Sequence, residues 1–218
     1  MKKQLLINTL IVLVAVSPLL YLLFAWNSIP PTFTTRFEFD QAIEKVQTRE
    51  SLLTATITLS VVSVLLYILM RNLRRVDPKV TRETPTSSFH KLGLAITLFL
   101  VVINYVFILS AEKQIVIDSK IAIGVFGMLI MTIGNYMNNL KPNYVAGIRL
   151  PWTLNDPENW RKTHQLAAKI WFAGGIVLII ISFLLSKSIL IPSTIILFIA
   201  LIVIPGLYSY KIYRRNLN

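Results

Sequence analysis

Six long apolar runs constrain the fold of this chain more than any other feature of its sequence. Each holds about 20 residues with few charges, and at about 1.5 Å of rise per residue an α-helix of this length crosses roughly 30 Å of hydrocarbon. The runs are Leu5–Trp26, Leu52–Met70, Leu92–Ala111, Ile121–Met137, Leu166–Leu185 and Leu190–Tyr210. The sequence therefore predicts an all-α, polytopic membrane protein with six transmembrane helices.

Composition agrees with this class of protein. Of the 218 residues, 55% are hydrophobic and 15% are charged, whereas a soluble domain is about one quarter charged. The chain has no cysteine, which excludes a disulfide-stapled scaffold and cysteine-ligated metal sites. The first run follows Lys2 and Lys3, as a signal sequence would, but it is longer than the roughly 7–15 apolar residues of a cleavable signal. We interpret it as an uncleaved span.

The distribution of basic residues predicts the orientation of the spans. Fifteen lysines and arginines fall on the two termini and the even-numbered loops, and six fall on the odd-numbered loops. Because cytoplasmic segments carry the excess of positive charge, both termini are expected to be cytoplasmic. The net charge of +12 is then an orientation signal and a contact for anionic lipids, and we expect no direct binding of nucleic acid.

The loops divide the predicted chain into two parts. Residues 1–76 form a two-span unit with an external loop at 27–51, residues 77–91 form a cytoplasmic linker, and residues 92–218 form a four-span unit. In the external loop, Pro30 and Pro31 favour an extended start. Its aromatic residues are expected at the bilayer interface, and Gln41–Glu50 is expected to be a helical lead into the second span.

Prolines interrupt the backbone hydrogen bonding of two predicted spans. Pro18, Pro192 and Pro205 lie within predicted transmembrane helices. Proline leaves a carbonyl of the preceding turn without its usual donor, and neighbouring helices are expected to satisfy that carbonyl.

The most distinctive segment is residues 135–164, which we call the signature loop. Pro142, Gly147 and Pro151 exclude a continuous helix through it. Asp156 followed by Pro157 predicts a helix start that continues into the fifth span. Its candidate binding residues combine basic, amide and aromatic side chains: Asn135, Lys141, Asn143, Arg149, Trp152, Trp160, Lys162 and His164.

A simpler interpretation of this loop stays open. Tryptophan and tyrosine gather at membrane interfaces and basic residues meet anionic headgroups without any dedicated ligand.

Two polar residues at membrane depth, Lys169 and Asn104, each have one structural and one functional interpretation. Lys169 either extends its ammonium to the headgroups or contacts an ion or ligand inside the bundle. Asn104 either bridges helices or lines a pathway.

No motif for catalysis or cofactor binding is present in the sequence. The two histidines, His90 and His164, have no carboxylate or second histidine at metal-ligand spacing. No acidic residue lies within a span, which argues against proton-coupled transport. We therefore expect no metal, no cofactor and no enzymatic activity.

The signature loop resembles the SdpI family of bacterial membrane proteins. The resemblance rests on Gly134-Asn135-Tyr136-Met137, Lys141-Pro142-Asn143-Tyr144, Gly147-Ile148-Arg149, Pro151-Trp152-Thr153-Leu154, Trp160, Lys162-Thr163-His164 and Gly174-Gly175. The first two spans are similar to a short domain of unknown function that commonly precedes this region. The resemblance implies immunity to a secreted, membrane-active killing peptide of the Sdp system. In the best-known member of the family it also implies the sequestration of a small cytoplasmic repressor at the membrane.

Two further functions remain as alternatives. A small-solute transporter or channel would use Lys169, Asn104 and Asn135 to line a polar cavity. An enzyme at the cytoplasmic interface would use His164 as its base.

Overall fold

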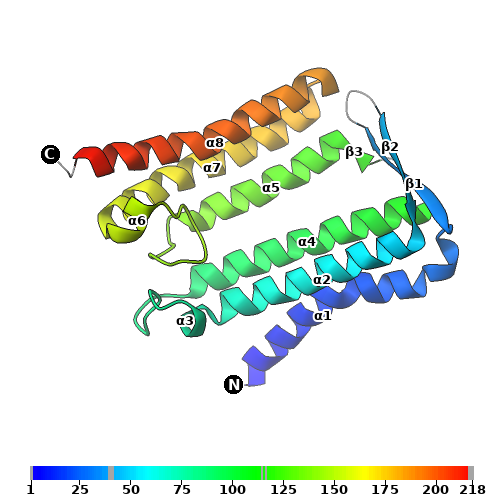
Figure 1. Ribbon diagram of the computed structural model, residues 1–218, viewed down its shortest axis with the longest axis horizontal. Helices are drawn as coiled ribbons and strands as arrows, with labels where there is room; N and C mark the ends of the chain where they lie inside the picture. The colour runs from blue at the N-terminus through cyan, green and yellow to red at the C-terminus, as the bar shows by residue number, and fades with distance from the viewer. Residues whose placement is uncertain (1, 39–41, 114, 116, 216–218) are drawn as a thin grey trace. The chain divides into compact units, whose positions relative to one another are not determined.

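The structure is a computed structural model that describes residues 2–38, 42–113, 115 and 117–215 (Figure 1). The elements in chain order are α1 (Lys2–Phe24), η1 (Trp26–Ser28), β1 (Thr32–Glu38), β2 (Ala42–Thr48), α2 (Arg49–Arg71), α3 (Leu73–Val76), α4 (Ser87–Lys113), β3 (Ile117–Asp118), α5 (Ser119–Met137), α6 (Pro151–Asn155), α7 (Pro157–Leu184) and α8 (Lys187–Arg215).

Six helices in the described part of the chain are long and apolar enough to cross a membrane, and they are α1, α2, α4, α5, α7 and α8. Many large apolar side chains on them are exposed, such as Leu13 at 55% and Phe183 at 73%. Such surfaces are stable against lipid but not against water. The prediction of a helical, multi-pass membrane protein with six spans is confirmed.

The residues group into two compact units. The first holds Met1–Ile68 with Gly93–Ile121, and the second holds Leu69–Leu92 with Ala122–Asn218. Most of α4 thus packs with α1 and α2, although the sequence division at residue 91 assigns it to the C-terminal part. The sequence division remains a prediction about domain organisation.

The first unit has its apolar core near the external loop. Leu22, Ile29, Phe33, Leu52 and Ile108 are buried together there. Phe33 is therefore a core residue, and the expectation of a place at the bilayer interface is wrong for it. Polar contacts also join the helices of this unit, because the Asn104 amide on α4 donates to the Thr56 carbonyl and to Ser60 Oγ on α2, each at 3.2 Å.

Strands replace the helix expected before the second span. β1 pairs antiparallel with β2, Thr32 lying opposite Thr48, and β3 pairs in parallel with the other edge of β1. The helical prediction for 41–50 is wrong over Ala42–Thr48, and residue 41 lies outside the described residues. Helix α2 begins only at Arg49, where Thr48 and Ser51 each accept the other's backbone N–H at 3.2 Å, a reciprocal cap.

Side chains in the bundle satisfy carbonyls that two of the buried prolines leave free. Pro18 has no N–H to donate to the carbonyl of Val14, and this carbonyl instead accepts the Ser17 hydroxyl at 2.8 Å. Pro205 likewise has no N–H for the carbonyl of Leu201, which accepts the Trp171 indole N–H at 2.8 Å. The donor at Pro205 comes from the neighbouring helix α7, as predicted, whereas the donor at Pro18 comes from α1 itself.

Glycines bring α5 and α7 together in the second unit. A Cβ atom at Gly134 would lie 2.4 Å from the backbone N of Phe172, and one at Gly175 would lie 2.4 Å from the backbone N of Met131. Small residues allow this close approach of transmembrane helices. Ile130, Leu178 and Leu201 form the buried apolar cluster beside it.

Candidate functional site

The signature loop folds against the first turns of α7 through Trp160 and His164. The two rings stack with centroids 4.0 Å apart, and each residue is 1% exposed. The indole N–H of Trp160 donates to the Leu140 carbonyl at 2.8 Å. The helix start at Asp156 is as predicted, since its carboxylate accepts the backbone N–H groups of Glu158 and Asn159.

Both ring nitrogens of His164 are occupied by backbone partners. Nε2 accepts the N–H of Ile148 at 3.0 Å, and Nδ1 lies 2.8 Å from the Trp160 carbonyl oxygen. A carbonyl can only accept, so these partners assign the proton to Nδ1 and leave Nε2 as an acceptor. His164 therefore fixes the path of the loop and has no nitrogen left for a substrate.

Gly147 makes this contact with His164 sterically feasible. Its φ is +109°, a backbone conformation that favours glycine. A Cβ atom at this position would also lie 2.4 Å from His164 Nε2. The two observations give the same requirement for glycine, one from the backbone and one from the neighbouring ring.

Asn143 organises the turn that precedes Gly147. Its side chain is fully buried. Its Oδ1 accepts the N–H groups of Val145 and Ala146, and its Nδ2 donates to the carbonyls of Lys141 and Ala146, all within 2.6–2.9 Å. Such side-chain bonds to nearby backbone stabilise a turn in place of regular structure.

The segment between α3 and α4 is joined to the signature loop through Asp77 and Lys79. The Asp77 carboxylate is buried and accepts the Tyr144 N–H at 2.5 Å and the Lys79 N–H at 2.9 Å. The Lys79 ammonium donates to the Leu154 carbonyl and lies 4.9 Å from the centroid of the Tyr144 ring. The predicted linker is thus part of the folded site.

A buried polar network ties α6 and α7 to α8, which pack side by side (Figure 1). The Trp152 indole donates to Ser209 Oγ at 2.9 Å. Ser209 Oγ in turn donates to Asn159 Oδ1 at 2.8 Å, and Asn159 Nδ2 donates to the Ser209 carbonyl at 3.0 Å. Trp152 also stacks on Tyr213 with centroids 5.5 Å apart.

The basic candidates remain on the surface. Lys141, Arg149, Lys162 and Lys169 are exposed. Arg149 donates to the Tyr144 carbonyl at 2.6 Å, and Lys162 lies 3.3 Å from the Glu158 carboxylate. Such an exposed ion pair contributes little to stability, so the ammonium is available to another anion.

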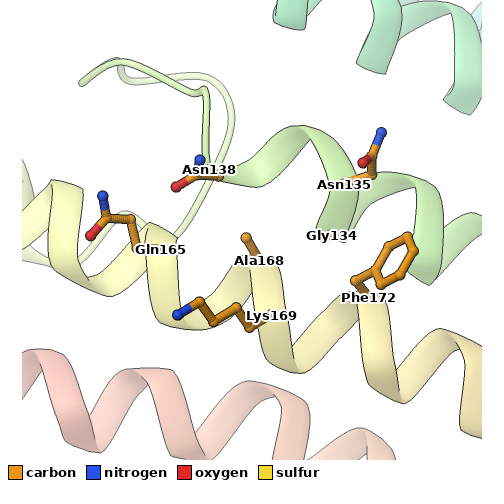
Figure 2. A pocket seen from close by; sticks show the side chains of 7 residues that line it. All are labelled: Gly134, Asn135, Asn138, Gln165, Ala168, Lys169 and Phe172. Atoms are coloured by element: carbon orange, nitrogen blue, oxygen red, sulfur yellow. The ribbon is translucent and has the colours of Figure 1, made fainter.

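An open pocket of about 550 Å³ lies between the end of α5 and α7. Figure 2 shows Asn138, Gln165 and Lys169 toward one end of it, and Gly134, Asn135 and Phe172 toward the other end. Asn135 and Lys169 thus line one pocket, as the transport alternative expects, whereas Asn104 bridges helices of the first unit.

Apart from Asn104, which bridges helices of the first unit, the structure separates the predicted site residues into two sets. Four carry the loop's internal packing: Asn143, Trp152, Trp160 and His164. Five are accessible: Asn135 and Lys169 in the pocket, and Lys141, Arg149 and Lys162 on the surface.

The sequence analysis did not single out Asp77, Asn159 or Ser209 as site residues. Their signal is weak in one sequence, because each acts through a contact that is distant along the chain. No group of three or more metal-ligating side chains occurs among the residues that the structure describes.

Comparison with known proteins finds a family and a relative that are similar to the C-terminal part of the chain. Residues 139–210 match the model of the SdpI/YfhL protein family. Over 108 residues the chain is 31% identical to "Immunity protein SdpI" of Bacillus subtilis (strain 168), an alignment that covers 50% of this chain and 51% of that protein. The chain thus matches about half the length of this curated relative. No solved structure matches the chain significantly.

Proposed function

Because residues 139–210 match the model of the SdpI/YfhL protein family, we propose that this protein is a non-enzymatic immunity protein of the bacterial cell membrane. Its role is to protect the cell from a secreted, membrane-active toxin peptide. The relative from Bacillus subtilis is named an immunity protein, and the same activity is proposed for this chain.

One observation carries the proposal: the family match coincides with the segment that the polar contacts hold together. Residues 139–210 include most of the signature loop, α6, α7 and most of α8. Within them the buried side chains of Asn159 and Ser209 form one network with the part-buried Trp152. A buried network with satisfied partners favours one defined arrangement of these elements, which a recognition surface needs.

The accessible residues are proposed to contact the partner, and the buried ones to hold them in place. Arg149 presents a guanidinium, which binds carboxylates through paired hydrogen bonds, close to the Tyr144 carbonyl. Asn135 and Lys169 offer an amide and an ammonium in the open pocket. The toxin would be met from outside or within the bilayer, and the membrane lipids surround the spans.

Protection by variant proteins in a toxin-sensitive bacterial strain tests the assignment of residues. Cells expressing Arg149→Ala or Trp152→Ala are expected to lose protection against the killing peptide of the Sdp system. Arg75→Ala is the matched control, since Arg75 is exposed and lies outside the matched residues. Membrane expression is checked for each variant. If Arg149→Ala and Trp152→Ala both gave full protection, the loop would be an interfacial segment only, and its assignment as a binding surface would be wrong.

A second role, sequestration of a small cytoplasmic repressor, is proposed for the basic surface formed by Lys141, Arg149 and Lys162. Recruitment of a fluorescent repressor to the membrane on exposure to the peptide is its test. A repressor that stays in the cytoplasm of protected cells would separate the two roles and remove the second.

A transporter or channel is the alternative that the pocket favours, because Lys169 and Asn135 both line it. Solute flux into proteoliposomes that disappears with Lys169→Ala would support transport over immunity. The enzyme alternative has less support, since both nitrogens of His164 are bonded to backbone groups.

A further inference from the structure

A second, strongly basic cleft lies between α7 and α8. It has a volume of about 520 Å³ and is lined by Lys162, Tyr208, Lys211, Ile212 and Arg215. Lys162 comes from the start of α7 and the other four residues from the end of α8. Three cationic side chains and a phenol therefore meet in one concave surface.

No acidic residue on α8 balances this charge. The sequence contains no aspartate or glutamate after Glu158, so Lys211 and Arg215, one helical turn apart, repel each other on an acid-free helix. Glu158 lies 2.6 Å from Arg161 and 3.3 Å from Lys162. Its single carboxylate is shared between these two cations, and Glu158 does not line the cleft.

Helix electrostatics explain only part of the cluster. Basic residues in the last turn of a helix interact favourably with its negative end, which accounts for Arg214 as well as Arg215. They do not account for the convergence of Lys162 from another helix on the same cleft. A bound anion relieves the repulsion among all three cations, and the tyrosine hydroxyl is a further donor to it.

The surface beside the cleft is apolar and exposed. Ile204 and Leu207 precede Tyr208 and Lys211 by one turn of α8, and they are 45% and 64% exposed. A ligand with an anionic head and a hydrocarbon chain matches a basic cleft followed by such a stripe. Basic pockets between transmembrane helices bind anionic lipid headgroups in this way.

We propose that the α7–α8 cleft binds a phosphate group, and that its source is the headgroup of an anionic phospholipid. Lys162, Lys211 and Arg215 contact the phosphate oxygens, Tyr208 donates a hydrogen bond, and an acyl chain lies along Ile204 and Leu207. The lipid would thereby join the matched family region of α7 to the end of α8.

The test measures binding of phosphatidylglycerol to the purified full chain in a neutral detergent by native mass spectrometry. Phosphatidylcholine, which has no net charge, is the lipid control. Lys211→Gln and Arg215→Gln are each expected to weaken phosphatidylglycerol binding by about tenfold, because each removes a charged contact to phosphate. Arg214→Gln is the matched control: it removes the same charge from the adjacent position, which does not line the cleft.

Competition identifies the source of the phosphate. If millimolar inorganic phosphate displaces the lipid from the unmodified chain, and does so less from Arg215→Gln, phosphate is the recognised group. Binding of phosphatidylglycerol that phosphate does not displace supports the lipid as a whole. Equal losses for Arg214→Gln and Arg215→Gln, or no preference over phosphatidylcholine, would overturn the site. Unchanged elution from a sizing column shows that the variants are folded.

Discussion

His164 carries a large share of the order in the signature loop. The residue is 1% exposed, and its ring stacks on Trp160. The ring also accepts a hydrogen bond from the backbone N–H of Ile148 and donates one to the carbonyl of Trp160. Spacing along a helix predicts that Trp160 and His164 share a face. It does not predict that both ring nitrogens of His164 are bonded to backbone groups, because the N–H of Ile148 lies in a loop whose path depends on Gly147.

We expect His164→Ala to destabilise the protein without removing any surface contact. The substitution leaves the part-buried N–H of Ile148 without its acceptor, for which a cost of about 1–3 kcal/mol is the upper range, and it removes the ring that packs on Trp160. The apparent melting temperature in detergent is the measurement. Val177→Ala, on the same helix at a residue that is 43% exposed, is the control, and equal melting temperatures for the two variants would contradict this role of His164.

At the scale of elements, the packing of α5 on α7 depends on glycines that the apolar pattern alone does not explain. The lengths and order of the spanning helices follow from the six apolar runs. The exception lies in the external loop, where Ala, Glu, Lys and Gln favour a helix locally, but pairing with Thr32–Glu38 produces strand β2. Strand formation depends on such a neighbour more than on local preference.

Gly175→Ala and Gly206→Ala are expected to have opposite consequences. A methyl group at Gly175 would lie 2.4 Å from the Met131 nitrogen and 2.7 Å from the Gly127 carbonyl oxygen, so α5 and α7 must separate. Nothing lies within 4 Å of a methyl group at Gly206, where alanine favours the helix by about 1 kcal/mol.

Melting temperatures in detergent decide between these expectations. We predict a clear decrease for Gly175→Ala and no decrease for Gly206→Ala. Similar values for both variants would show that the close helix contact contributes little to stability.

At the scale of the whole molecule, the orientation in the membrane is the prediction that depends most on charge. The chain has no cysteine, so single cysteines report on orientation without background. Val46 is 71% exposed on β2, and Arg82 is exposed between α3 and α4. A membrane-impermeant maleimide added to intact cells is expected to label Val46→Cys and to spare Arg82→Cys, because the charge distribution predicts that the basic loop is cytoplasmic. Labelling of Arg82→Cys alone would reverse the orientation.

The family region and the network of Trp152, Asn159 and Ser209 support the central claim that this protein confers immunity. The direct measurement is the survival of a sensitive bacterial strain over a range of concentrations of the killing peptide of the Sdp system. Cells carrying the chain are compared with cells carrying the empty vector. The account predicts that the chain raises the concentration needed to kill half of the cells. Identical killing curves, with the protein shown to be present in the membrane, would contradict it.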